Sequence, residues 1–317
     1  MHESNDQTPA TAFAQLDDES VLAITGPDAT RFLQGQLTCD VAALQPGHST
    51  LGARCNPKGR MQSSFRLTKL DEEHYLLALP EELLQAQQQD LARYAVFFKV
   101  ELQARNEQWL RLGLWGDDSP AALTAIGLQA DTASPQTGLA VTVGDTAFEV
   151  WLPRQQAPAG LTALARHAAP ATLNDWQLQL IRLGIGQVRE ATRESFIPQM
   201  LNLQQLGGVS FQKGCYTGQE IVARMQYLGK LKRRMYRLLW PSGQVPLPGT
   251  ALVDHDTGKM VGDVVMAAAA GEHTELLAVL QTDAAELPSL MVHNTSEPPL
   301  TLATLPYEQQ LAADAAQ

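Results

Sequence analysis

The sequence predicts an α+β fold made of more than one domain. The chain has 317 residues, which is long for a single hydrophobic core. Strand-like and helix-like segments are mixed along it without the strict βαβ alternation of a doubly wound fold. After Gly229 the pattern changes to short strands broken by Pro, Gly and Asp, which is typical of a small antiparallel barrel. We therefore expect a flexible tail over 1–15, a body of two interleaved α+β domains over 16–230, a C-terminal β-barrel over 231–306 and a second tail over 307–317.

Apolar periodicity, turn residues and helix-start signals predict the individual elements. In the body the expected strands are 20–25, 61–70, 74–79, 96–102, 109–115 and a hairpin of 139–143 with 147–152 around Gly144-Asp145. The expected helices are 26–37, 81–94, 120–126, 161–167 and 172–183, with a loop over 52–60. In the C-terminal part the expected strands are 235–240, 251–253, 260–266, 275–281 and 290–292, and the residues after Pro306 form a frayed helix.

Composition excludes several classes of protein. A net charge of −11 argues against broad non-specific binding to nucleic acid or to an anionic membrane. The apolar runs are far shorter than the ~20 residues of a membrane helix, and no secretory or transit segment is visible. Three widely spaced cysteines, Cys39, Cys55 and Cys215, are typical of a reducing cytosol, so we expect a cytoplasmic protein with no membrane contact. Phosphate-binding loop, G-x-S-x-G and H-E-x-x-H motifs are absent and the histidines are scattered, so no stable metal site is predicted.

The most informative stretch reads Lys-Gly-Cys-Tyr-Thr-Gly-Gln-Glu over 213–220. Thr217 and Glu220 have the spacing of a capping box at the start of a helix. Cys215 would then lie near free backbone N–H groups and beside Lys213, and both favour the reactive thiolate. The alternative is that Cys215 is a small buried hydrophobe next to a capped helix.

These residues resemble the signature of a family, the YgfZ-type, folate-binding branch of the glycine-cleavage T-protein superfamily. The flanking residues fit as well: 196–199, 202–203, 207–211 and 222–224, together with Trp176 and Arg182-Leu183-Gly184 upstream and the blocks 32–40 and 56–61 near the N-terminus. The resemblance implies a GcvT-like ring of three domains with a central pocket for tetrahydrofolate or a derivative. It also implies a role in maintaining iron–sulfur enzymes, including those that methylthiolate tRNA, so the implied partners are such tRNA-modifying radical enzymes and, weakly, tRNA.

One departure from the family pattern bears on activity. T-proteins that transfer a methylene group carry two aspartates where this chain has Gln62, Ser63 and Ser64. Without a carboxylate beside the folate nitrogen, general acid–base work there lacks its residue. The helix that carries the T-protein folate-binding glutamate reads Arg182-Leu183-Gly184 here. We therefore expect folate binding without standard aminomethyl transfer, the alternative being a folate-dependent one-carbon transferase or demethylase.

A pterin needs a flat wall, in-plane hydrogen-bond partners and a cation for its glutamate tail. Trp176 is the expected wall, with core packing as the alternative, and Arg182 either pairs with a ligand carboxylate or bridges to Glu190 or Glu194 on the surface. Cys215 is the candidate reactive thiol. The other candidate contacts are Asn202, Lys213, Gly214, Tyr216, Gln219 and Arg224.

The only dense basic run is Arg224, Lys230, Lys232, Arg233, Arg234 and Arg237. It is either a solvated helix end or a patch for a polyglutamate tail, a tRNA backbone or an acidic partner. The latter option keeps a tRNA-binding protein as a third functional hypothesis. Cys39 and Cys55 are expected to be structural.

Overall fold

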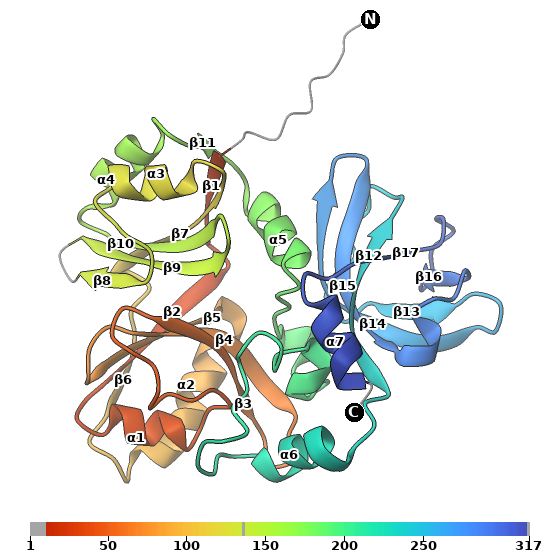
Figure 1. Cartoon of the computed structure of the whole chain (residues 1–317), viewed down its shortest axis with the longest axis horizontal. Helices are drawn as coiled ribbons and strands as arrows, with labels where there is room; N and C mark the ends of the chain where they lie inside the picture. The colour runs from red at the N-terminus through yellow and green to blue at the C-terminus, as the bar shows by residue number, and fades with distance from the viewer. Residues whose placement is uncertain (1–10, 135–136, 316–317) are drawn as a thin grey trace, which may run out of the picture.

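The computed structural model describes residues 11–134 and 137–315, which fold into three β-sheets with helices on their outer faces and between them (Figure 1). The strands are β1 Thr11–Gln15, β2 Glu19–Thr25, β3 Ser49–Cys55, β4 Met61–Lys69, β5 His74–Pro80, β6 Glu101–Ala104, β7 Trp109–Gly116, β8 Thr132–Ser134, β9 Gly138–Gly144, β10 Ala147–Pro153, β11 Ala169–Pro170, β12 Arg233–Trp240, β13 Ala251–Asp254, β14 Lys259–Ala270, β15 His273–Gln281, β16 Leu290–Val292 and β17 Thr301–Ala303. The α-helices are α1 Ala29–Gln34, α2 Glu81–Ala95, α3 Ser119–Ala125, α4 Ala157–Leu164, α5 Leu173–Arg182, α6 Gln219–Leu228 and α7 Glu308–Ala315.

The first two sheets are interleaved in the chain. The first has the order β11-β1-β7-β10-β9-β8 and the second the order β3-β4-β5-β2-β6. The chain therefore starts in the first sheet, builds the whole second sheet and returns to the first at β7. Helices α3 and α4 cover the outer face of the first sheet, and α1 and α2 pack on the second (Figure 1). Apolar residues such as Val21 and Trp151 form a core where the two sheets meet.

The third sheet is antiparallel, with the order β16-β13-β14-β15-β12-β17, and it curls into a half-barrel. Helix α5 lies between this sheet and the first one. The side chain of Asn174 donates to the backbone oxygen of Ala269 (2.9 Å) and accepts from its N–H (2.8 Å), which fixes the helix against β14. Among the described residues no helix has both the length and the apolar character needed to cross a bilayer.

The α+β class, the C-terminal antiparallel sheet and the β9–β10 hairpin are confirmed. The tail predicted over 1–15 is wrong for 11–15, because β1 is buried between β7 and β11; residues 1–10 lie outside the described part. The helix predicted after Pro306 is present as α7, but the segment does not begin as a free tail. Tyr307 is buried and donates its hydroxyl to Gly184 O at 2.7 Å, and α7 follows it.

Two smaller predictions also need correction, and a short strand of the third sheet was missed. The loop expected over 52–60 begins only at Asn56, because β3 pairs with β4 up to Cys55. The strand expected over 96–102 is shifted to Glu101–Ala104, since the residues before it form turns. Strand β17 was not predicted, because its three residues are recognisable only by their pairing with β12.

Candidate functional site

The signature segment 213–220 forms a loop over 213–218, which packs on the turn after β3, and then enters α6. Gly218 adopts a left-handed conformation with φ of 83°, and a Cβ there would lie 2.5 Å from Asn56 O. Only glycine combines this backbone angle with so close an approach. Thr217 N donates to Gly35 O at 3.4 Å, so the loop also contacts the end of α1. The signature loop thus lies beside the two N-terminal blocks of the resemblance, 32–40 and 56–61.

The capping box predicted for Thr217 and Glu220 is wrong. Helix α6 begins at Gln219, and its N-cap is Gly218, which has no side chain to accept the free N–H groups. The Oε1 of Gln219 accepts from Tyr216 N at 3.3 Å, and Glu220 extends into solvent, where it pairs with Arg224 at 2.8 Å. Cys215 is consequently four residues before the helix, outside its first turn.

Lys213 is a buried anchor of the signature loop. Its Nζ donates to Leu37 O at 2.7 Å and to Cys39 O at 2.8 Å, and its side chain lies over the Tyr216 ring. The residue is 8% exposed, and burial lowers its pKa to about 8. The expectation that Lys213 activates Cys215 is not supported, because two backbone carbonyls hold the ammonium and no described contact joins it to the thiol.

The three cysteines have different environments. Cys215 is exposed, and open space surrounds Gly214 beside it. Cys39 and Cys55 are buried, and burial raises the pKa of each thiol to about 12. Tyr216 packs near both, and burial raises its pKa too. Cys215 is therefore the accessible thiol of the three, although it lines none of the cavities found in the described part of the chain.

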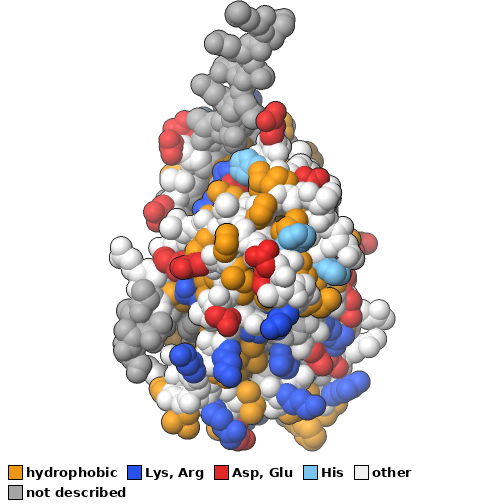
Figure 2. Space-filling model, turned by 90° about the vertical axis from the view of Figure 1, so that its right-hand side faces the viewer, with side chains coloured by type: hydrophobic (Ala, Val, Ile, Leu, Met, Phe, Trp, Pro, Cys, Tyr) orange, Lys and Arg blue, Asp and Glu red, His pale blue; other side chains and the backbone are white. Residues whose placement is uncertain are grey.

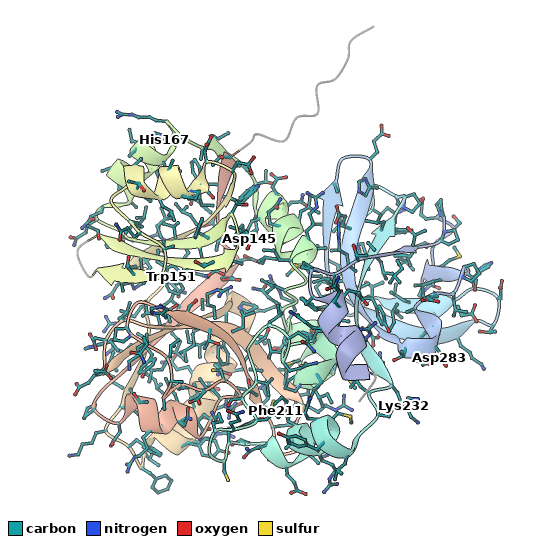
Figure 3. All side chains as sticks on the ribbon, viewed as in Figure 1. Asp145, Trp151, His167, Phe211, Lys232 and Asp283 are labelled. Carbon is teal, nitrogen blue, oxygen red and sulfur yellow. The ribbon has the colours of Figure 1, made fainter. Side chains whose placement is uncertain are left out.

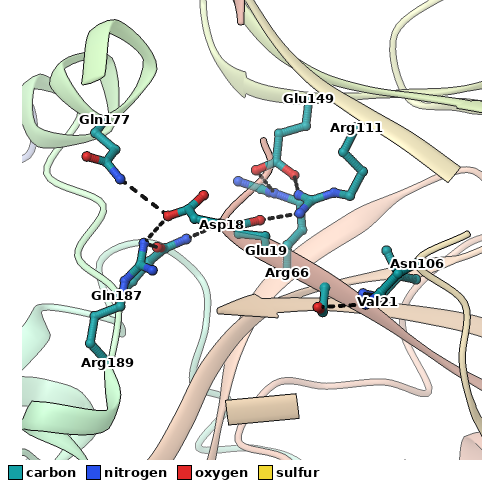
Figure 4. A network of polar contacts seen from close by, with 11 residues as sticks. Asp18, Glu19, Val21, Arg66, Asn106, Arg111, Glu149, Gln177, Gln187 and Arg189 are labelled. Carbon is teal, nitrogen blue, oxygen red and sulfur yellow. Dashed lines mark hydrogen bonds and ion pairs between the residues drawn. The ribbon is translucent and has the colours of Figure 1, made fainter. Parts of the chain in front are cut away.

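At the centre of the molecule four charged side chains form a buried network that the sequence analysis missed (Figure 4). Arg111 on β7 pairs with Glu19 on β2 and, at 2.6 Å, with Glu149 on β10. Glu149 also accepts from Arg66 Nε on β4 at 2.9 Å, and Arg111 lies over the Trp151 ring. Two cations and two anions are thus balanced where the first two sheets meet. A single charge within an otherwise apolar strand was the available signal, as in Trp-Leu-Arg-Leu-Gly-Leu-Trp at 109–115.

Further hydrogen bonds and an ion pair connect this network to the segment after α5 (Figure 4). Gln187 donates to Glu19, and Arg189 pairs with Asp18 at 2.6 Å. Asp18 also accepts from Gln177 of α5 at 3.3 Å. Burial alone would raise the pKa of Glu19, but Arg111, Gln187 and Arg189 outweigh it and hold that pKa below its ordinary value. Glu19 is therefore a fixed carboxylate at neutral pH.

The network faces a small central cavity of about 20 Å³, which has room for about one water molecule. Its polar edge consists of Glu19, Arg66, Glu149 and Ser64, whose Oγ accepts from Val188 N at 2.8 Å. Its apolar lining comes from Leu51, Phe65, Leu180, Ile185 and Leu203. The expectation that no acid stands near Ser64 is wrong, because Glu19 on β2 of the same sheet and Glu149 on β10 of the first sheet line the same cavity as Ser64. Gln62 and Ser63 are not on this cavity: Ser63 donates to Gln87 of α2 at 2.9 Å.

The predicted pocket residues upstream of the signature have structural contacts. Trp176 is 1% exposed and packs against Trp115 in a tilted arrangement, with ring centroids 5.8 Å apart, so it belongs to the core and lines no described cavity. Arg182 pairs with Glu275 at 2.7 Å, not with Glu190 or Glu194. Buried Asn202 is left-handed with φ of 54° and donates to Met235 O at 3.0 Å, which organises a turn.

The basic run is largely neutralised. Arg224, Arg233, Arg234 and Arg237 pair with Glu220, Asp263, Glu308 and Glu275 respectively. Lys230 and Lys232 are exposed and have no ion pair among the described residues, and Lys232 points outward before β12 (Figure 3). Figure 2 shows basic side chains gathered on the lower half of the face that carries the third sheet, at the height of α6. Of the six residues of the expected patch, only these two lysines thus lack an ion pair in the described part of the chain.

Comparison with known proteins gives concordant matches. Residues 11–139 match the model of the GCVT N-terminal domain. The tRNA-modifying protein YgfZ of Photobacterium profundum is 35% identical over 78% of this chain and 76% of its own length. The protein of the same name from Colwellia psychrerythraea is 31% identical over 95% and 94%. Among solved structures, the glycine cleavage system aminomethyltransferase T of Bartonella henselae superposes with a TM-score of 0.73 at 18% identity, over 94% of this chain and 86% of that one.

Proposed function

The chain belongs to the YgfZ family, whose members are named tRNA-modifying proteins, and we propose that it binds a reduced folate at the central cavity and supports the iron–sulfur enzymes that modify tRNA. The proposal of folate binding rests on the residues that line that cavity. Apolar side chains line it, and one edge presents two carboxylates and a guanidinium.

This arrangement matches the chemistry of a pterin. The ring is flat and apolar on its faces, and its pyrimidine edge carries adjacent N–H donors that suit a carboxylate. Glu149 is the candidate acceptor, because it lies on the cavity and Arg66 holds it in place. Phe65 and Leu180 supply apolar contacts for the ring faces. The tetrahydrofolate would supply a one-carbon carrier, while these side chains orient it and exclude water.

The cavity must widen before it can admit a pterin, because about 20 Å³ is far smaller than the ring. The segment Ile185–Gln187 forms one wall, and it is irregular backbone between α5 and the next short helix. Such segments move at lower cost than strands paired on both sides. We propose that this segment moves outward when the folate enters, with Gln187 releasing Glu19.

One-carbon transfer is the second candidate, because Glu19 and Glu149 place carboxylates where the sequence analysis expected none. A general acid must hold a proton near neutral pH. The lowered pKa of Glu19 and its contact with Arg111 work against that role. We therefore propose binding and orientation as the main task of this site, not proton transfer.

For the predicted site residues we propose different tasks. Cys215 is exposed, so its thiol is available to a partner protein instead of to the folate ring. Lys213 and Tyr216 are buried beneath it and shape the loop that presents it. Trp176 packs in the core behind the cavity.

A tRNA contact through Lys230 and Lys232 is a further candidate function. It would show as a steep salt dependence of tRNA binding that a Lys230→Gln/Lys232→Gln variant loses.

Titration with tetrahydrofolate tests the folate proposal. Trp115 and Trp176 pack against each other in the core, so binding should change tryptophan fluorescence. Glu149→Gln should weaken binding about tenfold or more, since it removes an ionic acceptor. Glu286→Gln, a change at an exposed acid between β15 and β16 of the third sheet, should leave the affinity unchanged. Absence of a saturable signal with wild-type protein at millimolar tetrahydrofolate would refute the proposal.

The proposed support of tRNA-modifying iron–sulfur enzymes is tested separately. Cells that lack this protein and carry either the wild-type or the Cys215→Ala chain should differ in methylthiolated tRNA nucleosides, measured by mass spectrometry. Equal levels in the two strains would remove the thiol from the mechanism while leaving the folate titration unaffected.

A further inference from the structure

A second cavity, of about 110 Å³, lies beside the signature loop. Its walls come from the end of β3 and the turn after it, from α2, and from Thr217. Arg54 on β3 pairs in register with Ser63, whose hydroxyl contacts α2, whereas the next residue, Ser64, lines the central cavity. No residue lines both cavities, so the two are distinct spaces.

At this cavity a single carboxylate, that of Asp90, lies near three guanidinium groups. Asp90 Oδ2 is 3.2 Å from Arg54 Nη1 and 3.6 Å from Arg193 Nη2, and its Oδ1 is 3.7 Å from Arg93 Nη1. Arg193 is also 3.9 Å from Glu190. Of the charged side chains that line the cavity, Arg54 and Arg93 are therefore opposed by Asp90 alone, and the lining is net positive in a chain of net charge −11.

Arg54 is a buried cation with incomplete hydrogen bonding. It is 4% exposed, and its Nε has no hydrogen-bond partner among the described residues. Its Nη1 donates to Gln62 Oε1 at 2.6 Å and to Asp90. The amide of Gln62 in turn donates to Glu194 at 3.3 Å, but Glu194 is not part of the lining. A buried guanidinium normally has its donors satisfied by acceptors, and here a further acceptor is missing.

We propose that this cavity binds an oxyanion, the phosphate or carboxylate group of a small molecule, through Arg54 and Arg93. Guanidinium forks hold such groups with paired charge-assisted hydrogen bonds, and the hydroxyl of Thr217 adds a donor. A space of about 110 Å³ equals the liquid volume of about four waters, which suits one oxyanion group but no attached ring. The remainder of the molecule lies at the mouth, where the Tyr94 ring is 40% exposed.

This site is separate from the proposed folate site and does not depend on it. It uses residues of both sequence blocks, at Asn56-Pro57 and at Thr217, and so joins ligand binding to the loop that carries Cys215. Arg93 has a side chain that is 76% exposed, so it can close over the bound group without unfolding the helix.

Calorimetric titration of the full chain with inorganic phosphate and with L-glutamate tests the proposal. We expect saturable binding of at least one probe, weakened tenfold or more in Arg93→Ala and in Arg54→Lys. Arg166→Ala removes an exposed arginine far from the cavity and should leave the affinity unchanged. Phosphate binding alone would indicate a phosphorylated ligand, and glutamate binding a carboxylate ligand.

Two results would overturn it. One is no saturable heat with either probe at about 10 mM, tenfold above a Kd of 1 mM. The other is an equal loss in Arg93→Ala and Arg166→Ala, which would mean general attraction to positive charge. Arg93 is exposed, so its variant stays informative even if Arg54→Lys fails to fold. Tetrahydrofolate affinity should be the same in Arg93→Ala and wild type, which separates this site from the central one.

Discussion

Arg111 and Glu149 are joined at 2.6 Å, Nη2 to Oε2, at the point where the first two sheets meet. Both side chains are almost fully buried, so their charges are separated from water and depend on each other and on Glu19 and Arg66. The interface of the two sheets is thus ionic at its centre and apolar around it.

Removing Arg111 should be strongly destabilising. Arg111→Met leaves Glu19 and Glu149 buried without their shared cation, which costs about 3–5 kcal/mol in the free energy of unfolding. Urea denaturation measures it. The double variant Arg111→Met/Glu149→Leu removes one cation and one anion, so Glu19 and Arg66 keep the net charge of the network at zero, and it should regain part of the loss. A double variant less stable than the single one would contradict this account of the network.

Lys213 should make stability rise with pH between 8 and 9. Its folded-state pKa of about 8 lies below the ordinary 10.5, so in this interval the unfolded chain binds more protons. The free energy of unfolding then rises by up to about 1.4 kcal/mol per pH unit. Cys39 and Cys55, with pKa values raised to about 12, have the opposite effect above pH 9.

Urea titrations at pH 7.5, 8, 8.5 and 9 measure the Lys213 effect. Lys213→Met removes the buried ammonium and serves as the control, so its profile should lack the rise. The same pH dependence in both proteins would show that the buried ammonium is not the cause.

Cys215 should be the one cysteine that reacts in the native protein. Iodoacetamide attacks thiolates, and burial with a raised pKa protects Cys39 and Cys55. Mass spectrometry of the intact chain should show a single adduct at pH 7.5, and none with Cys215→Ser. Two or three adducts on folded protein would mean that the region around Lys213 opens readily.

Gly113 should tolerate no side chain. A Cβ there would lie 2.2 Å from the Trp176 ring, so Gly113→Ala forces the indole out of place and costs about 1–3 kcal/mol. Gly214→Ala is the matched control, because nothing lies within 4 Å of its Cβ position. Thermal unfolding compares the two. A Tm of Gly113→Ala equal to that of the control would place Trp176 outside the rigid core.

The strands and helices were predicted best where the pattern is local. The hairpin of β9 and β10 follows from two alternating runs around Gly144-Asp145, and Leu290–Val292 was predicted with its observed bounds. Strand β1 was missed because five residues of ordinary composition become a strand only between two neighbours. The helix start at Thr217 was misplaced, since the close approach of Gly218 to Asn56 overrides the capping preference.

The candidate site was predicted less well than the fold. The signature identified the loop around Cys215, and that thiol is exposed as a reactive group requires. Lys213 was assigned to the thiol, yet it faces the carbonyls of Leu37 and Cys39, which are over 170 positions away in the chain. The acids of the central cavity were missed altogether.

The sequence by itself determined the family, the α+β class and the glycine-rich loop that carries Cys215, because these depend on local sterics, periodicity and short motifs. Only the tertiary structure decided which charges meet. Glu19, Arg66, Arg111 and Glu149 lie on four strands of two sheets, and their contacts depend on strand register and on how the sheets pack. Electrostatic energy depends on distance and burial in space, and separation along the chain fixes neither.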